Sequence, residues 1–145
     1  MLKRKQPLKR THVKNLSARK PLRRVRLKKV KTVRKANRER AEFVREFSRC
    51  FNCNVGPNVW PPLSCHEIAS GPARGKAIQY RAAWLCLCGA CHDRLHRENW
   101  TVAAQLLLKL RNDPTFYDRD LVNRLRGRAP DAVSESEVEE CKWKR

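Results

Sequence analysis

Two pairs of cysteines constrain this chain more than any other feature. Cys50 and Cys53 form one Cys-x-x-Cys pair, and Cys88 and Cys91 form a second pair after 34 intervening residues. Thiolates paired at this spacing are typical of one tetrahedral zinc site. Such a site holds the two ends of a small domain together, and four thiolates leave no open coordination position. The pattern therefore predicts a structural Zn²⁺, with four reduced core cysteines as the alternative.

The other cysteines lack a partner at metal-binding spacing. Cys86 lies in an apolar segment, so we expect a small buried hydrophobic side chain, and Cys141 is expected to be a free thiol. The total of 7 cysteines is odd, and the paired spacing in a reducing compartment indicates metal ligation rather than a disulfide framework.

The positive charge of the chain is concentrated at its N-terminus. The sequence has 34 Lys and Arg against 14 Asp and Glu, a formal net charge of +20. Residues 1–38 hold 17 of the basic residues and no acidic one, which leaves +3 for residues 39–145. Such charge attracts polyanions through phosphate neutralisation and counterion release, so nucleic acid is the expected partner. The candidate phosphate contacts in this arm are Arg23, Arg24, Lys28 and Lys29. A localisation signal or a solvated charge run is the alternative.

Composition also predicts the domain organisation. Residues 1–38 contain no aromatic residue and few apolar ones, so this basic nucleic-acid-binding arm is expected to be disordered or extended when free. Residues 39–99 hold six of the 7 cysteines and three of the 4 histidines and form the expected core, and residues 100–145 are expected to be a helical extension. The sequence has neither an apolar run of about 18 residues nor a signal-like N-terminus, so we expect a soluble, cytoplasmic protein with no membrane association.

Hydrophobic periodicity and capping residues predict an α+β fold. We expect strands at 63–68 and 84–87, a short helix at 36–48, and a helix that carries His92 and His96 on one face at positions i and i+4. The expected C-terminal helices are 101–111, a helix from the Asp113-Pro114 cap to about Gly127, and an acidic helix from Ser134 to about Trp143. These helices would pack on the core or on a protein partner.

The histidines sit inside and just after the cysteine pairs, and at this point the sequence resembles a known family. Cys50-x2-Cys53, Cys65-His66 and Cys88-x2-Cys91-His92-x3-His96, within about residues 48–98, resemble HNH endonucleases with the ββα-metal fold and a four-cysteine zinc knuckle pair. Stand-alone members occur in bacteriophages and mobile elements.

The resemblance implies a metal-dependent enzyme that hydrolyses phosphodiester bonds of double-stranded DNA. His66 would be the general base, and Cys65, His92 and His96 would hold one catalytic divalent cation: Mg²⁺, Mn²⁺, Ni²⁺ or Zn²⁺. Arg74 and Lys76, in a glycine-containing loop after the first strand, are candidate DNA phosphate contacts or solvated surface residues.

Two positions depart from the family pattern. The middle Asn of the motif should fall near Ala83, and Gln79 is a candidate substitute. Cys65 stands where the family usually has Asp or His, and a soft thiolate favours zinc, nickel or cobalt over Mg²⁺. Glu67 should point to the face opposite His66, since strand side chains alternate. Asp93, which follows His92, is a candidate either to hydrogen-bond a ligand of the catalytic cation or to replace one.

Two other functions stay open at this point. The protein could be a noncatalytic zinc-binding module of a packaging machine or ribonucleoprotein, in which the histidines are structural. It could also be a nuclease that acts on RNA, because the arm and the site both recognise phosphate. A distance above about 10 Å between the His66 ring and both His92 and His96 would exclude a one-metal site.

Overall fold

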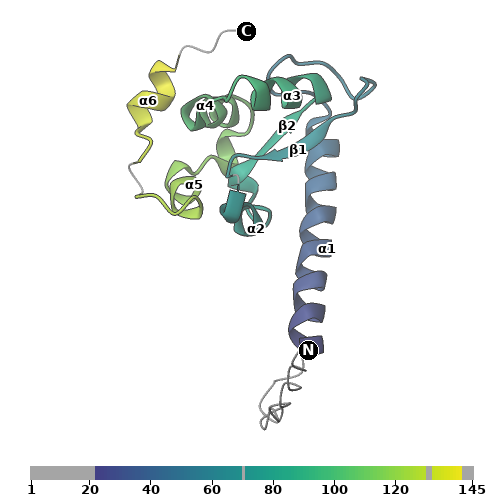
Figure 1. Ribbon diagram of the computed structural model, residues 1–145. Helices are drawn as coiled ribbons and strands as arrows, with labels where there is room; N and C mark the ends of the chain where they lie inside the picture. The colour runs from purple at the N-terminus through teal and green to yellow at the C-terminus, as the bar shows by residue number, and fades with distance from the viewer. Residues whose placement is uncertain (1–21, 70, 130–131, 142–145) are drawn as a thin grey trace, which may run out of the picture.

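The computed structural model describes residues 22–69, 71–129 and 132–141, with side chains from Thr32 onward. It is a small α+β fold in which a two-stranded hairpin lies among helices (Figure 1). The elements are α1 Leu22–Phe47, β1 Ser64–Glu67, η1 Gly71–Ala73, α2 Arg74–Ala77, η2 Arg81–Ala83, β2 Trp84–Leu87, α3 Gly89–Arg97, α4 Val102–Asn112, η3 Pro114–Phe116, α5 Arg119–Leu125 and α6 Glu135–Glu140.

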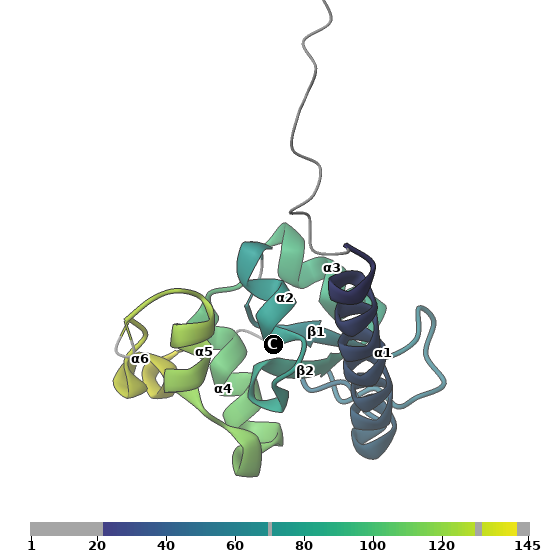
Figure 2. The ribbon, with the colours of Figure 1, turned by 90° about the horizontal axis from the view of Figure 1, so that it is seen from below.

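The hairpin separates two sides of the molecule. β1 and β2 pair antiparallel, with Cys65 opposite Cys86 and His66 opposite Leu85. Side chains alternate along a strand, so Cys65 and its neighbour His66 project from different faces. α1 packs on the hairpin from one side and α4 from the other (Figure 2). β2 is buried along its whole length because both of its faces are covered.

Helix α1 corrects the expectation of a disordered arm up to residue 38. It begins at Leu22, so the boundary expected at residue 38 falls inside it, and residues 1–21 lie outside the described part of the chain. The sequence 22–47 contains no Gly or Pro and is rich in Lys and Arg, which are good helix formers. Ala36 and Phe43 are buried, and a helix anchored by packing can extend turn by turn. Its N-terminal turns project beyond the other elements (Figure 1).

The C-terminal helices belong to the same hydrophobic core as the hairpin. Leu106 and Leu108 of α4, Val122 of α5 and Val138 of α6 join the cluster that contains β2. The boundary expected at residue 100 therefore does not separate two packing units. Cys86 is fully buried in this core, as predicted, and burial raises the pKa of its thiol to about 12.

One predicted helix start, at the Asp113-Pro114 cap, turned out differently. Asp118, rather than Asp113, caps α5, and its carboxylate accepts a hydrogen bond from the Leu121 N–H at 2.8 Å. Asp113 is instead buried beside Lys109, whose ammonium lies 2.6 Å from the carboxylate. The capping box of Ser134 and Glu137 at the start of α6 is confirmed. Within the described residues, the helices are either too short or too polar to cross a bilayer.

Candidate metal centres

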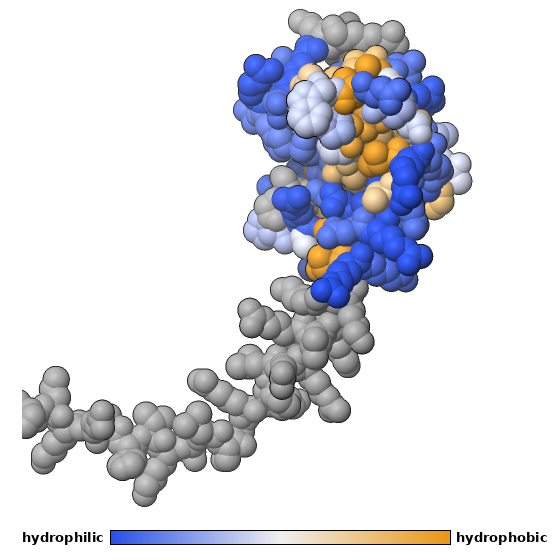
Figure 3. All heavy atoms as spheres, turned by 90° about the vertical axis from the view of Figure 1, so that its right-hand side faces the viewer, coloured by the Kyte–Doolittle hydropathy of each residue, from blue (hydrophilic) through white to orange (hydrophobic). Residues whose placement is uncertain are grey.

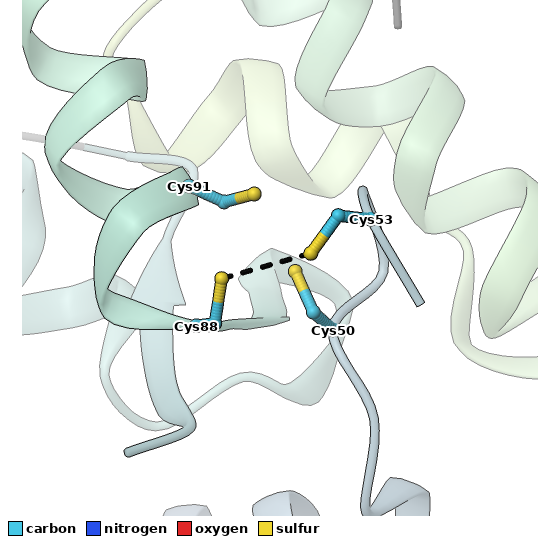
Figure 4. Close-up of side chains that lie close together, drawn as sticks. All are labelled: Cys50, Cys53, Cys88 and Cys91. Atoms are coloured by element: carbon cyan, nitrogen blue, oxygen red, sulfur yellow. Dashed lines mark hydrogen bonds between the residues drawn. The ribbon is translucent and has the colours of Figure 1, made fainter. Parts of the chain in front are cut away.

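The four paired cysteines meet at the start of α3. Cys50 and Cys53 follow α1, Cys88 is the N-cap residue of α3, and Cys91 lies in its first turn. Their four sulfur atoms all lie within 4.8 Å of one another and point to a common centre (Figure 4). Cys53 Sγ and Cys88 Sγ lie 3.7 Å apart. Four convergent thiol groups fit a structural Zn²⁺, as the sequence predicts.

Backbone hydrogen bonds preorganise the first cysteine pair, Cys50 and Cys53. The Cys50 N–H donates to Val55 O at 2.9 Å, and the Asn54 N–H donates to Cys50 O at 2.9 Å. Asn54 has a φ of 59°, a left-handed conformation that Asn tolerates better than most residues. Burial opposes ionisation of Cys50, but backbone N–H groups around its sulfur outweigh this and lower its pKa. The Asn52 amide also donates to Cys91 Sγ at 3.2 Å. Such N–H donors stabilise thiolates, which are the form that binds metal.

Three histidines form a second cluster between α3 and β1. His92 and His96 come from α3 and His66 comes from β1. His66 Nδ1 lies 3.1 Å from His92 Nε2, and His96 Nε2 lies 3.3 Å from the same His92 nitrogen. The ring centroids of His66 lie 5.0 Å from His92 and 5.6 Å from His96. The spacing condition for a one-metal site is therefore met.

A glutamine that the sequence analysis missed orients His66. Gln105 of α4 is buried, and its Oε1 lies 3.1 Å from His66 Nε2. Its amide nitrogen donates to Trp100 O at 3.0 Å, which fixes the direction of the amide. The signal available in the sequence was a polar residue inside an apolar helical segment, Ala104-Gln105-Leu106. Such a residue needs a partner when it is buried.

Two of these imidazoles, those of His66 and His92, have a lowered pKa. Burial is the main cause that lowers the pKa of His66 to about 4, and repulsion between the charged forms of His66 and His92 is the second. Burial, followed by His96, lowers the pKa of His92. Neutral imidazole is the form that binds a metal or accepts a proton. A cavity of about 180 Å³ borders the cluster between α3 and α4, with His66, His96, Trp100 and Gln105 in its wall.

Cys65 does not join the histidine cluster. It faces a groove of about 500 Å³ between α1 and β1, on a side of the molecule where apolar side chains gather (Figure 3). Its carbonyl accepts a hydrogen bond from Arg40 at 2.8 Å, and burial raises the pKa of its thiol to about 11. The alternation of side chains along β1 sends Cys65 away from the face that carries His66.

Glu67 shares the side of Cys65 and binds two arginines. It is buried and forms ion pairs with Arg40 of α1 and with Arg74 Nε of α2, the latter at 3.2 Å. The Arg74 side chain is 65% exposed, and its charge helps to lower the pKa of His66 and His92. Glu67 thus holds an exposed guanidinium near the histidines.

Two of the remaining predicted residues are exposed. Lys76 is exposed in α2, and Asp93 is exposed in α3 beside His92. The four arm residues Arg23, Arg24, Lys28 and Lys29 lie in the part of α1 whose side chains are outside the description.

The position of the missing motif Asn is occupied by a buried Ala83. The Ala83 carbonyl accepts from the Ile68 N–H at 2.8 Å, which closes the connection between the strands. The Trp84 indole donates to Ala77 O at 3.3 Å, and the Lys109 ammonium donates to Arg81 O at 2.8 Å. The Gln79 side chain is exposed. Trp84 and Lys109 therefore tether this loop by their side chains.

Comparison with known proteins adds no relative. No protein family model, no curated protein and no solved structure matches this chain.

Proposed function

We propose that this protein is a metal-dependent endonuclease of the HNH type that hydrolyses phosphodiester bonds in double-stranded DNA. The observation that carries the proposal is the convergence of His66 from β1 with His92 and His96 from α3. A two-stranded hairpin followed by a helix, with the histidines between them, is what the family resemblance implies. The four-cysteine zinc site braces the start of that helix.

A divalent cation at the histidines supplies Lewis-acid stabilisation of the charge that develops on the phosphate oxygens. His92 and His96 hold it, and they are positioned by one face of α3. His66 serves either as the general base that accepts the proton of the attacking water or as a further ligand. Both roles require the neutral imidazole that burial maintains.

Arg74 supports the recognition of a phosphate at this site. Its side chain is 65% exposed, its Nε lies 3.2 Å from Glu67, and a guanidinium carries five N–H donors, so it can bind a further anion. A guanidinium held by a buried carboxylate binds a phosphate oxygen without first losing much side-chain freedom. Lys76 is a more peripheral cation of the same short helix.

Helix α1 supports duplex DNA as the substrate. Its sequence from residue 22 to residue 38 contains nine Lys and Arg and no acidic residue. A helix fits the major groove of B-form DNA, whereas the major groove of A-form RNA is too deep and narrow. Because α1 is continuous with the turns that pack on the hairpin, DNA bound along it would be held at a set distance from the histidines.

Plasmid nicking tests the function. Purified full-length protein should nick supercoiled plasmid with Zn²⁺, Ni²⁺, Mn²⁺ or Mg²⁺, and His66→Ala should abolish the nicking under either role of His66. His12→Ala is the matched control, because it removes the one histidine of the sequence that the proposal gives no role. Nicking that persists unchanged in His66→Ala contradicts the proposal. Binding without nicking in the wild type would favour the noncatalytic zinc-binding module, for which Ala83 at the motif position is the specific argument.

The salt dependence of DNA affinity tests whether α1 binds DNA. Replacing Arg23, Arg24, Lys28 and Lys29 by Gln should reduce the slope of log K against log salt by up to about 3 to 4. The charge-matched control replaces four arginines outside α1, namely Arg111, Arg124, Arg126 and Arg128. Equal effects of both variants would mean that binding follows net charge rather than α1. Parallel titrations with duplex RNA and duplex DNA decide the substrate class.

A further inference from the structure

We propose that His66, His92 and His96 are three ligands of a single transition metal ion, with Zn²⁺ preferred over Mg²⁺. His66 then takes the third ligand position, which the sequence analysis assigned to Cys65, and is not a free general base. This inference rests on the proposed function for the use of the ion, but the metal site itself is argued from the side chains alone.

Hydrogen bonding by itself does not satisfy the histidine cluster. Gln105 Oε1 accepts from His66, so the proton of the neutral His66 ring is on Nε2 and Nδ1 carries a lone pair. His92 Nε2 contacts both this Nδ1 and His96 Nε2, at 3.1 and 3.3 Å. If His92 Nε2 donates its proton to His66, it has no lone pair for His96 and no second proton to donate. If it carries a lone pair instead, it faces the lone pair of His66. A bound cation satisfies all three nitrogens at once.

The spacing of the nitrogens fits a tetrahedral ion. Zinc binds imidazole nitrogen at about 2.0–2.1 Å, and two ligands at the tetrahedral angle are then about 3.3–3.4 Å apart. The two short separations in the cluster, 3.1 and 3.3 Å, are close to this value. A general base that acts on a water bound to the ion would need room for that water between its nitrogen and the ligands. The 3.1 Å separation between His66 and His92 leaves none.

The nearby alternative ligands are engaged elsewhere. Cys65 faces the groove between α1 and β1, and its carbonyl accepts a hydrogen bond from Arg40 at 2.8 Å. Glu67 is committed to Arg40 and Arg74. Three imidazoles match the preference of Zn²⁺, Co²⁺ or Ni²⁺, whereas Mg²⁺ prefers oxygen ligands.

The site would keep one coordination position open. Three protein ligands leave a tetrahedral ion one place for water or a phosphate oxygen, as in catalytic zinc sites. Exposed His96 marks the side from which this position is reached. His66 would then use both nitrogens, Nδ1 for the ion and Nε2 for Gln105. Gln105 acts as the positioning residue that fixes the ring orientation of the ligand.

Metal binding by the full-length protein tests the proposal. Dialysis against Zn²⁺ followed by metal analysis should give two ions per chain in the wild type and in His12→Ala. His66→Ala and His96→Ala should each keep one ion and bind the second more weakly by about 100-fold or more, and Gln105→Ala should weaken it about 10- to 100-fold. In Co²⁺-loaded samples, the thiolate-to-cobalt charge-transfer band reports that the cysteine site, and hence the fold around α3, is intact in each variant.

One comparison separates the ligand role from the base role. If His66→Ala binds the second ion as tightly as the wild type while His96→Ala does not, His66 is no ligand and the proposal is overturned. A single ion per wild-type chain overturns it too. The endonuclease proposal is judged by plasmid nicking, so a two-ion protein that never nicks would retain the site and lose the function.

Discussion

The two clusters on α3 differ in the number and the exposure of their ligands. The cysteine cluster has four sulfurs, and three of its members, Cys50, Cys88 and Cys91, are buried. The histidine cluster has three nitrogens, and its members range from buried His66 to exposed His96. Both are positioned by the same helix, one at its first turn and one along the next turns.

This difference distinguishes a candidate structural site from a candidate catalytic site. Four thiolates complete a tetrahedral ion and exclude other ligands, so the ion contributes to folding. Three imidazoles leave one position that water or substrate can occupy. A single nine-residue helix thus connects a stabilising centre to a candidate catalytic centre. Substitutions in the two clusters should therefore change different properties.

The largest expected effect is loss of folding in Cys88→Ser. Structural zinc in small modules contributes about 10 kcal/mol or more of binding free energy to the folded state, so the variant should lose its zinc and its cooperative thermal unfolding. Circular dichroism melts and metal analysis measure both. Cys141→Ser, which removes a thiol distant from either cluster, should change the free energy of unfolding by less than about 0.5 kcal/mol. A fully stable Cys88→Ser protein would contradict the bracing role.

His96→Ala should leave the protein folded and lower its activity. Its side chain is exposed, so we expect a change in the free energy of unfolding within about 0.5 kcal/mol. Loss of the ion removes several kcal/mol of transition-state stabilisation, so plasmid nicking should fall by about 100-fold or more. Urea unfolding and nicking rates on the same preparation check the two expectations. Unfolding of the variant would show that the histidine cluster is also a bracing site.

Acid should destabilise the protein through His66 when only the cysteine site is loaded with zinc. The pKa of His66 is lowered to about 4 in the folded state, so between about pH 6.5 and pH 4 the unfolded chain binds a proton that the folded chain does not. The free energy of unfolding should therefore drop by about 2 kcal/mol from pH 7 to pH 5 through this group. Urea unfolding of wild type and His66→Gln at both pH values measures it. The variant should lack this part of the decrease, and equal decreases would mean that His66 is not held neutral.

The smallest effect is expected for Arg74→Gln. Loss of one exposed guanidinium contact to a phosphate should lower nicking about 10-fold, which corresponds to about 1.4 kcal/mol. The free energy of unfolding should change by less than about 1 kcal/mol, because the Arg74 side chain is exposed and the buried Glu67 keeps its ion pair with Arg40. Lys76→Gln removes a cation of the same helix that Glu67 does not hold, and it should leave nicking within about twofold. Equal effects of the two variants would remove the special role of Glu67.

Local patterns in the sequence predicted much of the fold correctly. The strands at Ser64–Glu67 and Trp84–Leu87, the helix that carries His92 and His96, and the α6 capping box follow from periodicity and capping residues a few positions apart. Helix α1 is longer than predicted. The composition of residues 1–38 does not show that the helix is anchored by the packing of Ala36 and Phe43. The α5 cap was misplaced because the competing partner of Asp113, Lys109, is buried only in the folded chain.

The sequence alone determined which residues could bind metal. Paired cysteines and histidines one helical turn apart are local features, and their spacing is sufficient to group them. Only the tertiary structure decided which of the two neighbours Cys65 and His66 faces α3, because one step along a strand reverses the side chain and packing selects the buried face. It also brought Gln105 to His66 from 39 residues away in the chain, a contact that no local pattern encodes.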